Sequence, residues 1–213
     1  MTEIKFTSRA DAVFERLESE ILTGVYKRGD VLTESELSKA LNVSRTPIRE
    51  AIRRLEQDHL IKETSKGHVV IGVSEQDILD IYDIRIKIEG VASRLCAENA
   101  SPELIKELGD TVDLQEFYAL KGEAEKVKIA DSRFHELIYK NTGSEIYEYI
   151  LSSLHSKVQL TRKNSMQETS RSAKALNEHK EIYLAIKNRN GALAEELMVK
   201  HVTNAKSHIT RLK

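Results

Sequence analysis

Hydrophobic residues in the first part of the chain recur with the period of amphipathic helices. An apolar stripe predicts a first helix over residues 9–23. A Ser/Thr-x-x-Glu capping box, Thr33 to Glu36, begins a second and shorter helix, because each end of the box satisfies an otherwise unpaired backbone amide. This helix is expected to stop at Asn42-Val43. Two helices are therefore predicted before residue 44.

A third helix, capped by Ser44, has one apolar face and one basic face. Pro47 lies in its first turn, where a missing N–H group costs nothing. The apolar stripe consists of Ile48, Ala51, Ile52 and Leu55. The opposite face carries Arg45, Thr46, Arg49 and Arg53. Because Arg45 and Arg49 are four residues apart, their side chains share that face.

Two short β-prone runs, residues 60–64 and 68–73, follow this helix and are joined by Ser65-Lys66-Gly67. The order of helix, short helix, tight turn, helix and hairpin is typical of a winged helix-turn-helix. In that fold the start of the third helix enters the major groove, where an arginine pairs with O6 and N7 of guanine. The N–H groups exposed at a helix start suit a phosphate. The alternative is that the arginines form only a solvated face.

The spacing of hydrophobic residues changes at Ser74, since the remainder of the chain has the spacing typical of helices. Helices are predicted from 74 to about 99, from 102, and near 123–140, 145–163, 169–188 and 191–211. The expected fold is mainly α: a winged helix-turn-helix over residues 1–73 and an antiparallel bundle of six or seven helices over residues 74–213.

Composition narrows the class of protein without identifying it. The 213 residues include 33 Lys+Arg and 34 Asp+Glu, but residues 39–66 carry seven basic and four acidic side chains, a weak indication of a polyanionic partner. No apolar run is long enough to span a bilayer, and the N-terminus lacks the apolar core of a signal peptide. A single cysteine, Cys96, excludes an intramolecular disulfide and favours a cytoplasmic setting.

Residues 33–57, TESELSKALNVSRTPIREAIRRLEQ, resemble the DNA-binding domain of GntR-family transcription regulators, and residues 43–51 lie close to the family signature. Residues 81–89, IYDIRIKIE, resemble the start of the all-helical FCD effector domain of the FadR-like subgroup. The resemblance implies that DNA is contacted by the third helix, the preceding helix and the wing tip. Those residues are Ser35, Ser44, Arg45, Thr46, Arg49, Lys66 and Gly67. Where the family commonly has glycine, this chain has His59, so the entry into the wing is expected to differ slightly.

The segment predicted to form the bundle contains a candidate metal site. Asp131 and His135 are one helical turn apart and can chelate one ion, and His179 and His201 lie on two later helices. From spacing alone, isolated helical histidines are more often surface or core residues. Resemblance to metal-binding FadR-like domains implies that all four residues bind a divalent ion, Zn²⁺, Ni²⁺ or Mn²⁺. The other histidines are interpreted as surface or wing residues: His59, His68, His155 and His208.

The metal would leave a coordination position for a small organic acid, with Arg85 neutralising its charge. The alternative is that Arg85 pairs with Asp83 or Glu89 at a helix surface.

The whole chain is expected to be a homodimeric repressor of a palindromic double-stranded operator, since one short recognition helix reads few base pairs.

Two other functions stay open. In the first, the ion itself is the signal. In the second, the same residues form a metal-dependent hydrolase with Glu136 or Glu178 as the base. Neighbouring residues on a helix point about 100° apart, which aims neither carboxylate well at the ion. Cys96 has no evident activating base and is interpreted as a packing residue. The sequence therefore favours a regulator that is not an enzyme.

Overall fold

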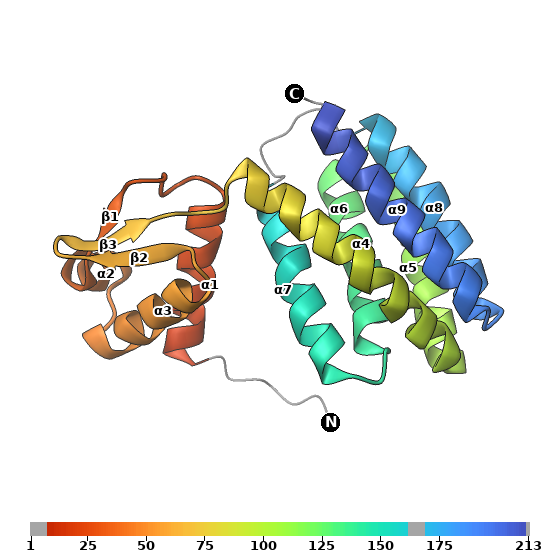
Figure 1. Cartoon of the computed structure of the whole chain (residues 1–213), viewed down its shortest axis with the longest axis horizontal. Coiled ribbons are helices and arrows are strands. Elements are labelled where there is room, and N and C mark those ends of the chain that lie inside the picture. Colours follow the sequence, from red (N-terminus) through yellow and green to blue (C-terminus); the bar gives the residue numbers. More distant parts are fainter. Residues whose placement is uncertain (1–7, 162–168, 212–213) are drawn as a thin grey trace. The chain divides into compact units, whose positions relative to one another are not determined.

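The computed structural model describes residues 8–161 and 169–211. They form two compact units, one made of residues 8–74 and 160–161 and the other of residues 75–159 and 169–211 (Figure 1). The mainly helical fold expected from the sequence is confirmed, with a small sheet confined to the first unit.

The first unit packs three helices around one apolar core. Its helices are α1 (Arg9–Leu22), α2 (Glu34–Leu41) and α3 (Arg45–Gln57). The predicted stripe of α3 is buried, and Leu17, Ile48 and Leu55 are among the side chains with no exposed surface. These residues form one cluster with apolar residues of α1, α2 and the sheet. Burial of this stripe holds α3 against the apolar core and leaves the basic face of the helix exposed to solvent.

The starts of α2 and α3 differ in how they are capped. Thr33 precedes α2, and its hydroxyl accepts a hydrogen bond from the backbone N–H of Glu36, which is one half of the predicted capping box. The other half differs from the prediction, because the Glu36 carboxylate accepts from the Thr33 hydroxyl instead of the Thr33 backbone N–H. Ser44 occupies the cap position of α3 in an extended conformation, but its side chain makes no capping hydrogen bond. The prediction that Ser44 caps α3 is therefore right about the position and wrong about the bond.

The wing is a three-stranded antiparallel sheet with the order β1-β3-β2. Its strands are β1 (Val31–Leu32), β2 (Ile61–Thr64) and β3 (Gly67–Val70). The hairpin of β2 and β3 was predicted, whereas β1, which pairs with β3 through Val31 and Val69, was not. At the tip, Gly67 has a φ of 127°, and a Cβ there would lie 2.9 Å from the carbonyl oxygen of Leu32. Glycine is therefore needed to let β1 approach.

His59 links α3 to the wing with a φ of 57°. This left-handed conformation is the one that glycine adopts most easily. The hairpin forms with His59 in place of the glycine expected from the family, so the backbone bears the left-handed conformation at a small cost.

The second unit is an all-helical bundle. The described residues form six helices there: α4 (Glu75–Glu98), α5 (Pro102–Leu120), α6 (Ala124–Lys140), α7 (Glu145–Thr161), α8 (Thr169–Lys187) and α9 (Gly191–Arg211). Close packing of α4 on α9 requires a small residue at Gly90, where a Cβ would lie 2.6 Å from a methyl group of Val199.

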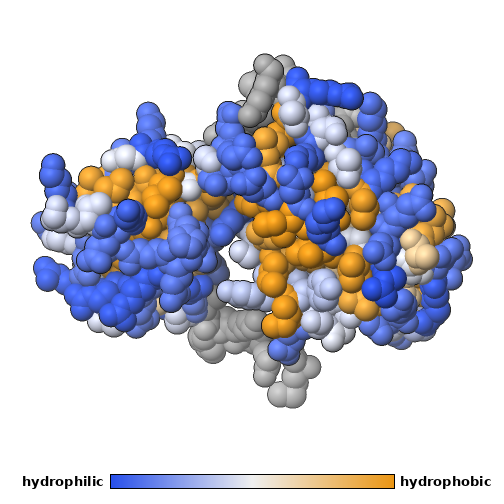
Figure 2. Space-filling view, in the orientation of Figure 1, coloured by the Kyte–Doolittle hydropathy of each residue, from blue (hydrophilic) through white to orange (hydrophobic). Residues whose placement is uncertain are grey.

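On the face drawn in Figure 2, apolar side chains gather over α4 and α7, consistent with the exposure of Ile84, Ile146 and Ile150. None of the described helices is both long and apolar enough to cross a membrane.

Cys96 is fully buried on α4, and burial raises the pKa of its thiol to about 12. The thiolate is the reactive form, so we expect Cys96 in the native protein to resist a thiol-specific reagent such as Ellman's reagent at pH 8. One equivalent of thiol should react only after denaturant is added. Rapid reaction of the native protein would contradict the interpretation of Cys96 as a packing residue.

Candidate metal centre and DNA-binding surface

The side chains predicted to contact DNA lie at the start of α3 and at two neighbouring positions of the first unit. Arg45, Thr46 and Arg49 are exposed on the first turns of α3, and Ser44 is exposed directly before them. Ser35 is exposed on the first turn of α2, and Lys66 lies in the exposed turn between β2 and β3. The fold therefore presents these polar side chains to solvent, as reading a DNA groove requires.

Arg49 has a protein partner that the sequence analysis did not foresee. Its Nε donates to Oε1 of Glu34 and its Nη2 donates to Oε2, each at 2.9 Å. These hydrogen bonds and the charge of the arginine lower the pKa of Glu34, so the carboxylate is ionised at neutral pH. Glu34 and Arg49 are 15 residues apart, so only the packing of α2 on α3 brings them together.

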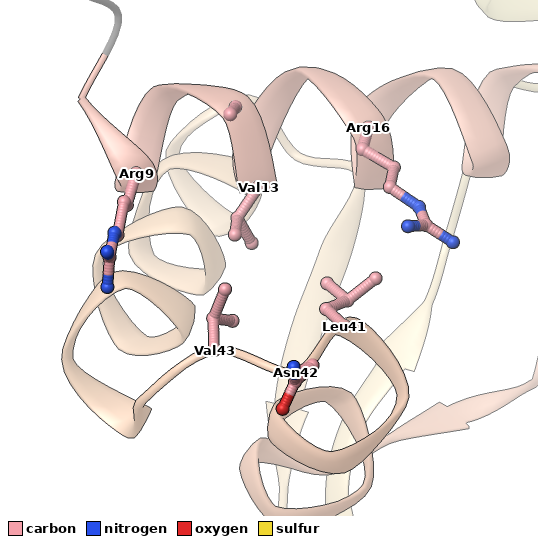
Figure 3. A pocket seen from close by; sticks show the side chains of 7 residues that line it. Arg9, Val13, Arg16, Leu41, Asn42 and Val43 are labelled. Carbon is pink, nitrogen blue, oxygen red and sulfur yellow. The ribbon is translucent and has the colours of Figure 1, made fainter.

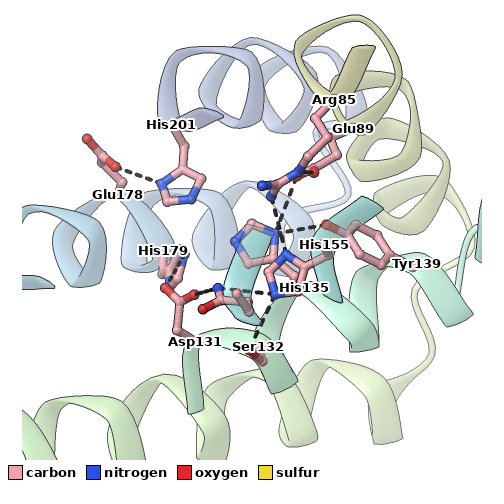
Figure 4. A network of polar contacts seen from close by, with 11 residues as sticks. Arg85, Glu89, Asp131, Ser132, His135, Tyr139, His155, Glu178, His179 and His201 are labelled. Atoms are coloured by element: carbon pink, nitrogen blue, oxygen red, sulfur yellow. Dashed lines mark hydrogen bonds and ion pairs between the residues drawn. The ribbon is translucent and has the colours of Figure 1, made fainter. Parts of the chain in front are cut away.

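A cluster of three buried histidines lies inside the second unit (Figure 4). His135 comes from α6, His179 from α8 and His201 from α9. One ring nitrogen of each lies within 4.8 Å of those of the other two. That spacing is on the scale of a single coordination shell, since nitrogens bound at about 2.0–2.1 Å to a tetrahedral Zn²⁺ lie about 3.3 Å apart and small side-chain shifts would bring these atoms to that distance. The three histidines predicted as ligands are therefore brought together.

The Nδ1 atom of each ring has a polar neighbour outside the three-histidine group. His179 Nδ1 lies 2.9 Å from Oε1 of Gln115, and His201 Nδ1 donates to Glu178 at 2.6 Å. His135 Nδ1 lies 3.4 Å from a carboxylate oxygen of Glu89 and 3.4 Å from the hydroxyl of Tyr139. Such contacts fix the orientation of a ring and leave its Nε2 atom for a metal. The outer partners are thus arranged as metal-binding histidines require.

His179 supplies the most direct indication that this cluster fits a metal ion. Its Nε2 atom is buried and has no hydrogen-bond partner among the described residues. Burial lowers the pKa of His179 and of His201, so both rings are neutral, which is the form that binds a metal. An unsatisfied buried nitrogen costs about 1–3 kcal/mol, and a cation at this position would remove that cost.

Asp131 lies at the edge of the same cluster. Its Oδ1 is 3.8 Å from His179 Nε2, too far for a hydrogen bond but near enough for both atoms to face one ion. Its Oδ2 accepts a hydrogen bond from Gln159 of α7 at 3.1 Å. Asp131 therefore lies beside the three-histidine group, next to His179.

Arg85 is also close to the histidine cluster. It is only 4 % exposed, and it forms an ion pair with the fully buried Glu89, one turn along α4. Its Nη2 donates to His155 Nδ1 at 3.3 Å. The alternative of a surface pair is thus right about Glu89 as the partner and wrong about the location. Because Glu89 balances the charge of Arg85, an anion binding there must compete with Glu89 or share the guanidinium with it.

The interpretation of His155 as a surface residue is wrong. His155 is 5 % exposed on α7, and its ring centre lies 4.9 Å from that of His135. Its Nε2 lies 3.3 Å from the hydroxyl of Ser132. Leu151 and Val158, at the positions i−4 and i+3, are buried beside it. This helical spacing was the signal that places His155 on the inward face.

The other histidines outside the cluster do not contribute to it. His68 lies in the wing, 3.1 Å from a carboxylate oxygen of Glu56, and His59 is exposed.

A separate pocket of about 420 Å³ in the first unit lies between α1 and the turn from α2 to α3 (Figure 3). It is lined by Arg9, Ala12, Val13, Arg16, Leu41, Asn42 and Val43, none of which is a candidate site residue.

Comparison with protein families decides the identity of both units. Residues 9–70 match the family model described as bacterial regulatory proteins, gntR family, and residues 80–204 match that of the FCD domain. The chain belongs to the GntR family. It carries an FCD domain after the DNA-binding domain, as the resemblance implied.

Among its GntR-family relatives is the uncharacterized HTH-type transcriptional regulator YdhC of Bacillus subtilis, which is 28% identical over 92% of this chain and 88% of the relative. The gluconate operon transcriptional repressor of Bacillus subtilis is 28% identical over 89% of this chain and 81% of that protein. The solved structure of Escherichia coli McbR/YncC has a TM-score of 0.79 at 20% identity and covers 97% of this chain and 99% of that one. The gntR-family match and the curated relatives make this chain a transcription regulator, and the likeness to McbR/YncC shows a shared fold.

Proposed function

We propose that this GntR-family regulator is a homodimeric repressor whose FCD domain holds a divalent metal ion and binds a small carboxylic acid. The acid changes the affinity of the first unit for a palindromic operator. The start of α3 reads base edges, the turn at Lys66-Gly67 contacts the backbone, and Ser35 and Ser44 contact phosphates.

One observation carries the metal part of this proposal. Three buried histidines from three helices each place a ring nitrogen within 4.8 Å of those of the other two, and Gln115 and Glu178 hold the Nδ1 atoms of His179 and His201. Asp131 completes a set of three imidazoles and one carboxylate, which suits Zn²⁺, Ni²⁺ or Mn²⁺. When bound, the ion would supply a positive centre that accepts a carboxylate oxygen from the effector.

The chain's own residues would position the rest of the effector. Arg85 and His155 lie on α4 and α7 beside His135, and Ser132 and Gln159 add further polar groups there. A ligand with a carboxylate and neighbouring hydroxyl groups would satisfy this mixture of donors and acceptors. Gluconate is the first acid to test, because relatives are named as gluconate operon repressors.

The hydrolase alternative is disfavoured by the position of Glu178. This carboxylate, one of the two candidate bases, accepts a hydrogen bond from His201 Nδ1 at 2.6 Å, behind the ring and away from its Nε2. A general base must instead reach a water on the ion. A regulator in which the ion alone is the signal uses the same ligands, and it predicts that DNA affinity follows metal content without any acid.

We expect purified protein to retain about one divalent ion per chain, measured by elemental analysis after gel filtration. His179→Ala and His201→Ala should each lose it, because removing one imidazole from a four-ligand site weakens binding severely. Exposed His59→Ala is the matched control and should keep the ion. The His155→Ala variant should also keep it, since His155 lies outside the three-histidine group.

Wild-type metal content in both His179→Ala and His201→Ala would show that the ligands are wrong. An ion lost equally in the His59→Ala control would show that the loss reflects handling of the protein and not removal of a ligand.

A further inference from the structure

We propose that Glu34 positions Arg49 for reading DNA, so that a carboxylate which itself repels DNA increases sequence specificity. This inference rests on the proposed function, in which Arg49 contacts base edges. Among the described residues, the hydrogen bonds of the Glu34 side chain go to Arg49 and not to α2, whose cap is supplied by Thr33.

The contact between the two side chains is bidentate. Oε1 of Glu34 accepts from Nε of Arg49 and Oε2 accepts from Nη2, both at 2.9 Å. Two parallel bonds between planar groups fix both the position and the plane of the guanidinium. Since Glu34 is the first residue of α2, its backbone is held by the packing of the helix-turn-helix.

The edge of the guanidinium that Glu34 leaves open is the one needed for guanine. Glu34 occupies the side formed by Nε and Nη2. Nη1 and the second hydrogen of Nη2 form the other edge, which can donate to O6 and N7 together. The Arg49 side chain is 56 % exposed, so this edge is accessible to a groove. Glu34 therefore holds the guanidinium of Arg49 in one orientation, whereas an unpaired arginine side chain samples many.

A role in stability does not account for this pair. The Glu34 and Arg49 side chains are 30 % and 56 % exposed, and ion pairs with such exposure add little to folding. Glu34 also carries a negative charge on the surface proposed to face phosphates, which opposes the binding of any DNA. Removing that charge should therefore raise affinity for unrelated DNA and lower the preference for the recognised sequence.

The experiment begins by selecting duplexes from a random-sequence library with wild-type protein. Affinities for an enriched duplex and for its scrambled counterpart are then measured for wild type, Glu34→Gln, Arg49→Ala and the double variant. Glu34→Gln should reduce the ratio of the two affinities about fivefold and bind the scrambled duplex more tightly than wild type does. In the Arg49→Ala background the same change should leave the ratio unaltered, because Glu34 acts through Arg49.

Glu36→Gln is the matched control. It removes one negative charge from the same turn of α2, and Glu36 contacts Thr33 and not Arg49. It should raise both affinities alike and keep their ratio, and the melting temperatures of Glu34→Gln and wild type should agree within about 2 °C.

An unchanged ratio in Glu34→Gln, or an equal loss in the Arg49→Ala background, would overturn the positioning role. If Arg49→Ala itself keeps the ratio, the assignment of Arg49 to base reading fails and the role of Glu34 fails with it. If wild-type protein enriches no duplex, the proposed DNA-binding function fails instead.

Discussion

Replacing Arg49 with alanine is expected to weaken binding to the recognised operator by about 5- to 150-fold and to flatten the preference among sequences. The loss corresponds to about 1–3 kcal/mol, the usual value of one bidentate contact between an arginine and a base. Glu34 would then be unpaired beside the DNA, which places the effect toward the upper end of this range. Titration of a fluorescent operator duplex measures the change.

Two matched variants separate base reading from general charge. Arg16→Ala removes an arginine of α1 that is 59 % exposed and paired with Glu20, much as Arg49 is paired with Glu34, and it should leave the operator affinity nearly unchanged. Lys66→Ala should weaken all duplexes evenly and reduce the salt dependence, because a phosphate contact carries no sequence information. Unchanged operator affinity in a folded Arg49→Ala protein would rule out α3 as the recognition helix.

The second large effect is expected in the response to the effector. The proposed ion lies in the second unit and the arginine face lies in the first, so the acid must change operator affinity at a distance. In the proposed function it does this by binding one conformation of the proposed dimer more tightly than another. A typical coupling free energy of about 1–3 kcal/mol would change operator affinity about 5- to 150-fold.

Asp131 is the residue whose loss should abolish this response while leaving the protein folded. It is the most exposed of the four proposed ligands, with 22 % of its side chain accessible, and no apolar core depends on it. The three histidines would retain part of the site, but the ion would lose its carboxylate ligand and Gln159 would lose its acceptor. We therefore expect the Asp131→Ala dimer to bind operator and to ignore the acid.

Local signals in the sequence were sufficient for most of the fold. Apolar stripes and capping residues such as Thr33 act within one or two helical turns, so helix positions follow from the sequence alone. The strand β1 was missed because its two residues become a strand only by pairing with β3, almost 40 residues later. Such short elements depend on tertiary contacts that no local pattern reveals.

The candidate site shows the same limit. The four proposed metal ligands could be chosen from the sequence, since a spacing and a family resemblance marked them. Their outer partners Gln115 and Glu178 could not, because helix packing decides which carbonyl or carboxylate meets each ring. His155 was misplaced for a different reason: one histidine was judged singly, without the buried residues one turn to either side.

The most direct test of the whole account is the change in operator affinity on adding a carboxylic acid to metal-loaded protein, measured for wild type and for Asp131→Ala. Fluorescence anisotropy with a panel of acids that begins with gluconate gives both affinities. The account predicts that at least one acid shifts the wild-type affinity by about 5- to 150-fold and that Asp131→Ala, still folded and dimeric, loses most of that shift. An equal response in the two proteins would contradict it, because the proposed metal site would then not be the site that senses the ligand.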